Sequence, residues 1–274
     1  MLATRVVTAV VLLAVLLGVV WSGSTLLFNA VLTLFFAAAI WERTRLFQLP
    51  MPLLAPALWS VVLLLVLLRY LDGVVYPLCM LCVAIWAIRL APALGLGLPP
   101  LATLPNRLVS VVYGIAILGC FAAIAAFYHR SPLYLLSVMA IVWVADIGAY
   151  FAGKAFGKRK LAPTISPGKS WEGAIGGGIA VLVLGSLSVV AGGPAFANTF
   201  AVRAQAAFGW PALVAILVLI TAASVVGDLF ESQLKRRAAM KDSSNLLPGH
   251  GGVLDRIDAL VPVLPLAIVI AFRL

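Results

Sequence analysis

Charged residues are scarce in this chain: they make up 10% of its 274 residues, whereas hydrophobic residues make up 64%. This composition excludes an ordinary soluble domain and indicates a protein that lies in a lipid bilayer. The apolar stretches run continuously and do not alternate with polar residues, which argues against a membrane β-barrel. Internal repeats, heptads and a separate polar domain are also lacking. We therefore expect one all-α, polytopic membrane domain over residues 1–274.

Cysteine is rare as well, and the 3 cysteines do not indicate a disulfide framework. Cys79, Cys82 and Cys120 all lie within apolar runs. Cys79 and Cys82 form a C-x-x-C pair, but no histidine, aspartate or basic residue stands nearby to activate a thiol. We interpret all three as small packing residues.

Apolar runs predict about nine transmembrane helices, since each crossing needs about 20 apolar residues. The first run could belong to a signal peptide, but another run follows it at once, so we expect a retained first helix. The helices divide into an amino-terminal group, 1–130, and a carboxyl-terminal half, 131–274, which carries the candidate site. Their expected ranges are 6–21, 25–41, 53–70, 73–91, 107–128, 133–153, 171–193, 211–234 and 257–273.

Basic residues outnumber acidic ones by 19 to 9, which gives a net charge of +10. Such a charge can indicate nucleic-acid binding, but these residues lie in short segments between apolar runs, where they set membrane topology. Fifteen would face one side of the membrane, and we take that side as cytoplasmic. We therefore expect no nucleic-acid partner, a plasma (inner) membrane location, a cytoplasmic amino terminus and an outside carboxyl terminus. Four basic residues would face outside: Arg69, Arg130, Arg203 and Arg273.

An acidic residue in the first half, Glu42, follows Trp41 and precedes Arg43 and Arg45 at a predicted membrane interface. Ion pairs at such positions are mostly solvated and contribute little to stability. We therefore expect Glu42 to belong to a surface pair and not to a functional site.

Asp146 lies several residues into the predicted helix 133–153. A carboxylate at that depth is costly, so it should face a partner or a polar cavity. Tyr150, Gly153 and Gly157 follow at helical spacing and would share its face. The two glycines could instead let a neighbouring helix approach closely, and the sequence leaves this alternative open.

The loop 166–173, SPGKSWEG, looks like the end of a phosphate-binding P-loop, but that motif requires a glycine at position 163, which is proline. We therefore reject a P-loop. Lys169 and Ser170 still form a turn that opens a helix, where backbone N–H groups and an ammonium group could bind an anion. Glu172 could contact a substrate or simply complement the helix dipole.

The stretch 228–258 holds five of the 9 acidic residues and lies between two long apolar runs. If the helix before it continues past the membrane, Asp228, Ser232 and Lys235 share one face, with Glu231 beside them. Basic residues alone would only set topology, but interleaved acidic residues contribute little to topology. This stretch is therefore the strongest candidate for a functional site.

A second pair of carboxylates, Asp255 and Asp258, would share a face at the start of the last helix. Carboxylates from two different helices suit Mg²⁺, which takes one or two of them together with phosphate oxygens. His250 stands in a Gly-His-Gly-Gly turn whose backbone N–H groups could bind an anion. The basic residues that could bind phosphates here are Lys235, Arg236, Arg237, Lys241 and Arg256.

This stretch resembles the signature of the phosphatidate cytidylyltransferase family, also called CDP-diacylglycerol synthase. The signature reads Ser-x-apolar-Lys-Arg, four residues, Lys-Asp, a small residue two further on, Pro-x-His-Gly-Gly, two residues, and Asp-Arg-apolar-Asp. The segment 146–173 is similar to the family's as well, so the resemblance covers roughly the last half of the chain. The matching signature residues are Ser232, Leu234, Lys235, Arg236, Lys241, Asp242, Ser244, Pro248, His250, Gly251, Gly252, Asp255, Arg256, Ile257 and Asp258.

The resemblance implies transfer of CMP from CTP to phosphatidic acid, giving CDP-diacylglycerol and pyrophosphate, with Mg²⁺ required. Asp228 and Asp255 are then the main expected metal ligands, with Asp258 a weaker candidate, and Lys235 and His250 complete the catalytic set. A second, monovalent cation and a homodimer are left open. The expected substrate-binding residues are Asp146, Lys169, Ser170, Glu172, Ser232, Arg236, Lys241, Asp242 and Arg256.

Two other functions are compatible with a charged site beside membrane helices. A CTP-dependent lipid kinase would share the nucleotide and the membrane helices, but it would leave CDP where a cytidylyltransferase leaves pyrophosphate. An ion-coupled transporter would distribute acidic residues through several helix centres and carry broken helices in paired halves. Here the acidic residues gather at one interface of one half, which favours the enzyme.

Overall fold

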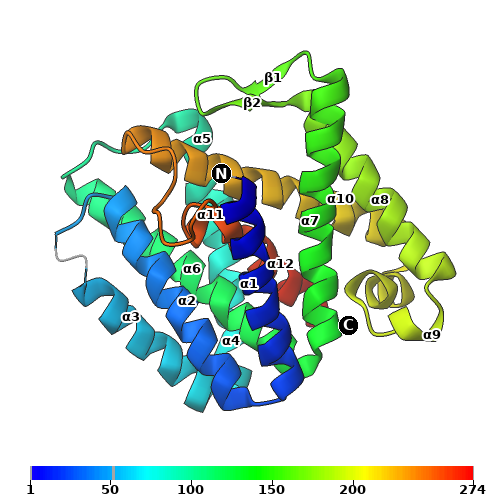
Figure 1. Cartoon of the computed structure of the whole chain (residues 1–274). Coiled ribbons are helices and arrows are strands. Elements are labelled where there is room, and N and C mark those ends of the chain that lie inside the picture. Colours follow the sequence, from blue (N-terminus) through cyan, green and yellow to red (C-terminus); the bar gives the residue numbers. More distant parts are fainter. Residues whose placement is uncertain (1, 51–52, 274) are drawn as a thin grey trace.

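A computed structural model describes residues 2–50 and 53–273 of the chain, and most of these residues are helical (Figure 1). The amino-terminal part consists of α1 (Leu2–Ser22), α2 (Thr25–Leu46), α3 (Leu54–Leu65), the π-helical turn η1 (Val66–Tyr70), α4 (Leu71–Ile85), the π-helical turn η2 (Trp86–Leu90), α5 (Ala93–Leu96) and α6 (Leu104–Arg130). The carboxyl-terminal part consists of α7 (Pro132–Phe156), β1 (Lys160–Ala162), β2 (Ser166–Ser170), α8 (Trp171–Ala191), α9 (Gly193–Phe196), α10 (Phe200–Arg237), α11 (Leu254–Ile257) and α12 (Leu260–Ala271).

The helical architecture confirms the predicted all-α, polytopic membrane fold. Among the described residues, 6 helices are long and apolar enough to cross a bilayer. Two shorter apolar helices cover Leu54–Arg69 and Leu260–Ala271. Every predicted range overlaps a helix, but the number of nine crossings stays a prediction.

The last two predicted helices differ from the structure at their starts. α10 begins at Phe200 and changes direction at Gly209, whose φ of 78° lies outside the helical region. The last long helix, α12, begins only at Leu260, because Pro262 has no N–H to donate to the carbonyl group of Asp258. The two carboxylates at 255 and 258 therefore do not lie in the first turn of one continuous helix, contrary to the prediction.

A β-hairpin occupies part of the segment that the sequence predicts as a loop. β1 pairs with β2 in antiparallel fashion, with Lys160 opposite Ser170 and Ala162 opposite Ser166. The sequence of β2 is polar and contains proline and glycine, so it lacks the apolar alternation by which a strand is recognised. Figure 1 shows the hairpin at the end of the α7–α8 pair, which it connects.

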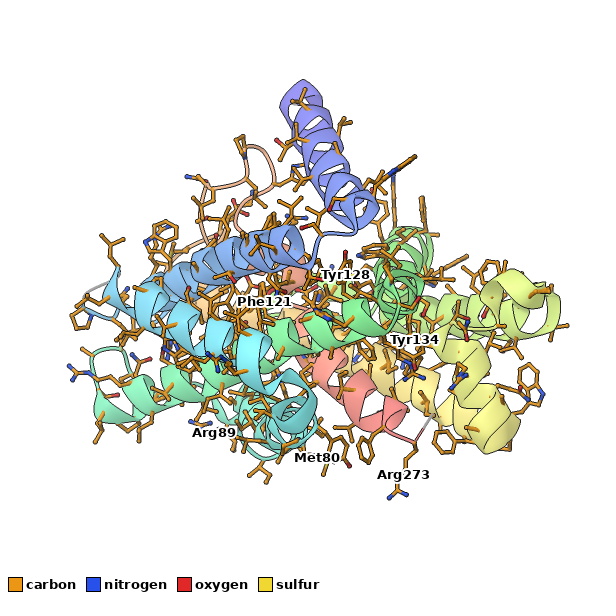
Figure 2. The ribbon with its side chains drawn as sticks, turned by 90° about the horizontal axis from the view of Figure 1, so that it is seen from below. Met80, Arg89, Phe121, Tyr128, Tyr134 and Arg273 are labelled. Atoms are coloured by element: carbon orange, nitrogen blue, oxygen red, sulfur yellow. The ribbon has the colours of Figure 1, made fainter. Side chains whose placement is uncertain are left out.

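α6 is the most buried of the six long apolar helices and packs against α2, α4 and α12. Its aromatic residues contact α2 directly: the ring of Phe121 lies 5.2 Å from that of Phe36, and Tyr128 stacks on Phe28 at 3.7 Å. Figure 2 shows Phe121 and Tyr128 among neighbouring helices, whereas α1 projects to one side. The core of the molecule therefore forms around α6.

α7 and α8 approach closely because their contact surface is built from small residues. A Cβ atom on Gly177 would lie 2.4 Å from the carbonyl oxygen of Ala145. One on Gly157 would lie 2.8 Å from Ser170 Oγ, whereas one on Gly153 would make an ordinary contact of 3.4 Å with the same atom. The close-packing interpretation thus holds for Gly157, and the α7–α8 pair forms one rigid wall of the site.

Candidate active site

A cavity of about 400 Å³ lies between α7, β2, α8 and α10. It brings together Asp146 of α7, Lys169 of β2 and Asp228 of α10, one from each segment that the sequence singles out. Much of its wall is apolar, so interactions between these charges are stronger than they would be in water. The cavity is therefore suited to a ligand that carries both charged and apolar groups.

Lys169 and Asp228 form a direct ion pair between Nζ and Oδ2. Both side chains keep 29% of their surface exposed. One turn further along α10, the hydroxyl of Ser232 donates to Asp228 Oδ1 over 3.3 Å, in agreement with the predicted shared face. Because the pair is accessible, an anion can bind the ammonium group and a cation can bind the carboxylate.

Asp146 lines the same cavity together with Tyr150 and Gly153, which confirms the face predicted from their spacing. Among the described residues, no group forms a hydrogen bond or an ion pair with the Asp146 carboxylate. Gly157 does not line the cavity and instead ends α7 against Ser170. Asp146 is therefore an uncommitted acceptor at the wall of the cavity.

Ser170 and Glu172 are engaged in local structure. Ser170 is the N-cap of α8, and its hydroxyl accepts a hydrogen bond from the N–H of Gly173. The carboxylate of Glu172 accepts from the backbone N–H groups of Lys158 and Arg159, at 3.1 to 3.3 Å. Both side chains hold the hairpin against α8, and in this way they position Lys169.

A second charged cluster surrounds Lys235, near the end of α10. Its Nζ lies 2.6 Å from Asp255 Oδ1 and 3.3 Å from Glu231 Oε1. The Glu231 side chain is fully buried, and within the described structure neither of its oxygens accepts a hydrogen bond. Glu231 is thus held by its ion pair with Lys235, which places a buried carboxylate next to the ammonium group.

Asp255 is the most heavily hydrogen-bonded of the predicted site residues. Its Oδ2 accepts from the N–H and the hydroxyl of Ser243 and from the N–H of Gly252, each at 2.8 Å. Burial opposes ionisation of this carboxyl, but the hydrogen bonds from Lys235, Gly252 and Ser243 outweigh it and lower the pKa of Asp255. Oδ1 pairs with Lys235 Nζ.

Asp258 lies between α11 and α12, close to α10. A Cβ atom on Gly227 would lie 2.4 Å from the carbonyl oxygen of Asp258, so only glycine permits this approach. Burial, and then the charge of Asp228, raise the pKa of Asp258 above its ordinary value. A cation placed between these two carboxylates would relieve their repulsion.

The carboxylates of the site fit Mg²⁺ in their chemistry. Within the described part of the chain, no three His, Cys, Asp or Glu side chains group closely enough to hold a metal by themselves. Mg²⁺ does not need such a group, because it commonly takes one or two carboxylates and completes its octahedron with phosphate oxygens and water. Asp228 and Asp258 can each provide a hard oxygen atom from a different element, while Asp255 Oδ1 is paired with Lys235.

The turn that carries His250 is shaped by the chain around it. Gly251 has a φ of 79°, in the left-handed region that glycine tolerates, and Arg256 donates to the carbonyl oxygen of His250 from Nε and Nη2. Among the described atoms, none pairs with the buried Nδ1 of His250. The predicted anion-binding role of the glycine N–H groups does not hold for Gly252, whose N–H donates to a carboxylate of the chain itself.

Three further predicted substrate-binding residues lie on the surface. Arg236, Lys241 and Asp242 are exposed, so they are available to a ligand that approaches from the aqueous side. Arg237 differs from its neighbour because its guanidinium group lies 4.9 Å from the centre of the Phe47 ring, where it packs α10 against the end of α2. Arg237 is therefore a structural residue.

The prediction that Glu42 is a surface residue is wrong. Its side chain is fully buried and accepts hydrogen bonds from residues about 200 positions away, namely Ser243, Ser244, Val253 and Leu254. A short charged segment next to a tryptophan is typical of a membrane interface, and no local pattern indicates partners so distant in sequence.

Glu231 also belongs to the site, although the sequence analysis assigns it no role. The signal was present, because it stands four residues before Lys235 on a helix, a spacing that favours ion pairs. Its complete burial could not be read from the sequence, since helical spacing alone does not say which side of α10 the carboxyl-terminal segment covers.

Comparisons with known proteins identify the family of the chain. The sequence profile of the cytidylyltransferase family matches residues 3–273. Proteins named phosphatidate cytidylyltransferase are similar over most of their length: that of Haemophilus influenzae is 37% identical over 97% of this chain and 96% of its own, and that of Pseudomonas aeruginosa is 40% identical over 97% and 95%. The Bacillus subtilis protein of that name is 42% identical over 48% of this chain and 45% of its own. The chain therefore belongs to the cytidylyltransferase family.

Proposed function

We propose that this protein transfers CMP from CTP to phosphatidic acid and so produces CDP-diacylglycerol and pyrophosphate. The observation that carries the proposal is the cavity in which Asp146, Lys169 and Asp228 meet, because it offers acceptors and a cation beside apolar helix surfaces. The full-length similarity to proteins named phosphatidate cytidylyltransferase supports the same reaction.

In the proposed reaction, a phosphate oxygen of the lipid attacks the α-phosphorus of CTP. A new P–O bond forms, the bond from the α-phosphorus to the oxygen that bridges to the β-phosphorus breaks, and the electron pair leaves on pyrophosphate. The phosphate monoester is already a nucleophile at neutral pH, so no covalent enzyme intermediate is needed. Catalysis then depends mainly on positioning and on stabilising the developing charge.

The protein's cations are proposed to bind the phosphates. Lys169 lies in the cavity beside the lipid-facing helices, so it suits the phosphate of the lipid. Arg236, Lys241 and Arg256 stand on the exposed side, where they can meet the nucleotide. Lys235 is held between Asp255 and Glu231, so its single positive charge stabilises both carboxylates but offsets only part of their negative charge.

The carboxylates are proposed to hold Mg²⁺ through Asp228, Asp255 and Asp258. When bound, Mg²⁺ would neutralise charge on the phosphates of CTP. The packing of the Asp258 backbone against Gly227, the residue before Asp228, supports this ligand set. The proposal also allows a second, monovalent cation at the site and a homodimeric protein.

The protein is proposed to work at the cytoplasmic face of the plasma (inner) membrane, with its carboxyl terminus outside. CTP is a cytoplasmic substrate and phosphatidic acid a membrane one, so a site between basic segments and apolar helices suits both. The hairpin and the end of α10 that carry the charged residues lie at one end of the molecule in Figure 1, which supports a single catalytic face.

The purified protein in detergent, given labelled CTP, phosphatidic acid and Mg²⁺, tests the proposal. We expect equal amounts of CDP-diacylglycerol and pyrophosphate. Release of CDP with a newly phosphorylated lipid would identify a CTP-dependent lipid kinase instead. If neither product forms, an ion-flux measurement in vesicles would test the transporter alternative.

A further inference from the structure

The carboxylate of Glu42, in α2, forms hydrogen bonds with the segment 243–254, which leads to Asp255 and contains the His250 turn. Glu42 Oε1 accepts from Ser244 Oγ at 2.5 Å and from the N–H of Val253 at 2.9 Å. Its Oε2 accepts from Ser243 Oγ at 3.2 Å and from the N–H of Leu254 at 2.7 Å. Two of these donors precede the His250 turn and two follow it. The side chain therefore fixes both ends of the segment 243–254.

The contact extends directly to the charged cluster. Ser243 contacts Glu42 and Asp255 with the same hydroxyl group, and Asp255 in turn contacts Lys235. Gly252 is required between them, because a Cβ atom there would lie 2.2 Å from Glu42 Oε1 and 2.1 Å from Ser243 Oγ. A continuous hydrogen-bonded layer thus joins α2 to α10 through the segment.

We propose that Glu42 is a positioning residue for CMP transfer. It holds Asp255 and the His250 turn in the place where they meet Lys235, and so the amino-terminal helices help to build the site. The inference rests on the proposed function, because it concerns the same site. Glu42 contacts the segment and not the cavity, so it acts through Asp255 and not on the substrates.

The number of donors makes the carboxylate hard to replace. Each oxygen faces two donors, one of them the Ser243 hydroxyl that is shared with Asp255, and an ionised carboxylate can accept on both oxygens. In Glu42→Gln, an NH₂ group would face two donors and leave them unpaired in a buried place, whereas Glu42→Asp keeps the charge but shortens the reach. A displacement of about 1 Å in a catalytic group can lower a rate about 100-fold.

The test compares the wild-type protein, Glu42→Gln, Glu42→Asp and the control Asn106→Ala, with thermal unfolding measured for each. Asn106 is also fully buried, and its Nδ2 donates to the carbonyl of Phe47, away from the segment. We expect kcat to fall about 100-fold in Glu42→Gln with a KM for phosphatidic acid close to that of wild type. Glu42→Asp should recover part of the kcat, and Asn106→Ala should lose stability but keep most of its kcat. A wild-type kcat in Glu42→Gln, or an equal loss of kcat in the control, would overturn the proposal.

Hydrogen exchange of the wild-type protein provides a second measurement that needs no variant. The amides of Val253 and Leu254 should exchange much more slowly than the amide of the exposed Asn245. Rapid exchange at both positions would refute the anchoring role even if the variants do not fold. An inactive wild-type protein would contradict the proposed function alone, and slow exchange would then still support Glu42 as the anchor of the segment.

Discussion

The candidate site has two sides that differ in how their charged side chains are bonded: the cavity side, with Asp146, Lys169 and Asp228, and the segment side, with Asp255 and Glu42. On the cavity side, Asp146 has no partner among the described residues, and the Lys169–Asp228 pair stays accessible in about 400 Å³ of space. On the segment side, Asp255 and Glu42 each face four donors, of which the Ser243 hydroxyl is shared between them, and both are surrounded by the chain. The cavity side thus leaves its charges available to a ligand, whereas the segment side surrounds its charges with donors of the chain, including Asp255, whose proposed contact with Mg²⁺ would need room beside Lys235.

This difference has an energetic consequence. Removing an accessible charge leaves few buried groups unpaired, so the folded state should change little in stability while the reaction slows. Removing a fully bonded charge leaves several buried donors unsatisfied, so stability and rate should fall together. Substitutions on the two sides should therefore differ in how rate and stability change together.

The largest effect is expected for Asp228→Asn on the cavity side. The change removes a charge that pairs with Lys169 and that is proposed to hold Mg²⁺, so the rate should fall about 1,000-fold with little change in thermal unfolding. Pyrophosphate release across a Mg²⁺ series measures it, and Ala222→Ser, on an exposed position of the same helix, is the control. A near-normal rate at limiting Mg²⁺ would contradict the ligand assignment.

On the segment side, Gly251→Ala should lower both rate and stability. Gly251 has a φ of 79°, and an added Cβ atom would lie 2.7 Å from Asp255 Oδ2. The left-handed conformation alone costs about 1–2 kcal/mol for alanine, and displacement of Asp255 should reduce the rate about tenfold. The control is Gly95→Ala, where a Cβ atom meets nothing within 4 Å. A loss of rate without any loss of stability would contradict the expectation that both fall together on the segment side.

Arg236→Lys tests a residue at the exposed boundary between the two sides. The guanidinium Nε donates to the carbonyl of Ile165 in the hairpin over 3.3 Å, and its remaining donors can bind a phosphate through two parallel bonds. Lysine keeps the charge but loses this geometry, so the KM for CTP should rise about three- to tenfold. Unchanged dependence on both CTP and the lipid would show that Arg236 binds neither.

The smallest effect is expected for His250→Gln. Since pyrophosphate is a competent leaving group and the lipid phosphate needs little help from a base, His250 should orient the turn or a phosphate and not carry an obligatory proton. The variant should keep a third or more of the wild-type rate, by order of magnitude, and a similar pH profile. Loss of a pH–rate limb near neutrality, with a fall as large as in Asp228→Asn, would establish acid–base catalysis instead.

The sequence predicts the cavity side well and the segment side poorly, and the reason is physical. Asp146, Tyr150 and Gly153 are placed by helical spacing, and Asp228 and Ser232 lie one turn apart on a single helix. Local periodicity determines these relations, so one sequence is sufficient to infer them.

The partners of Glu42 and the path of the hairpin depend on contacts that periodicity does not encode. Glu42 meets Val253 across more than 200 residues, and its polar neighbours in sequence suggest an interface instead. The strand Ser166–Ser170 has no apolar alternation and is held by the helices at its ends. The break between α11 and α12 was readable in principle from Pro262, but the continuous apolar run around it suggests an uninterrupted helix.

The length of α10 has a consequence for how the substrates meet. The part that follows Gly209 is about 42 Å long at 1.5 Å per residue, whereas the hydrocarbon core of a bilayer is about 30 Å thick. If this part of α10 crosses the bilayer from Gly209 onward, its last turns, which carry Asp228 to Lys235, would emerge at the depth of the lipid headgroups. A phosphatidic acid molecule can reach these residues by lateral diffusion, with its acyl chains still in the membrane. Neither the lipid substrate nor the lipid product then has to be extracted from the bilayer, and only the water-soluble nucleotide and pyrophosphate need to enter and leave from the aqueous side.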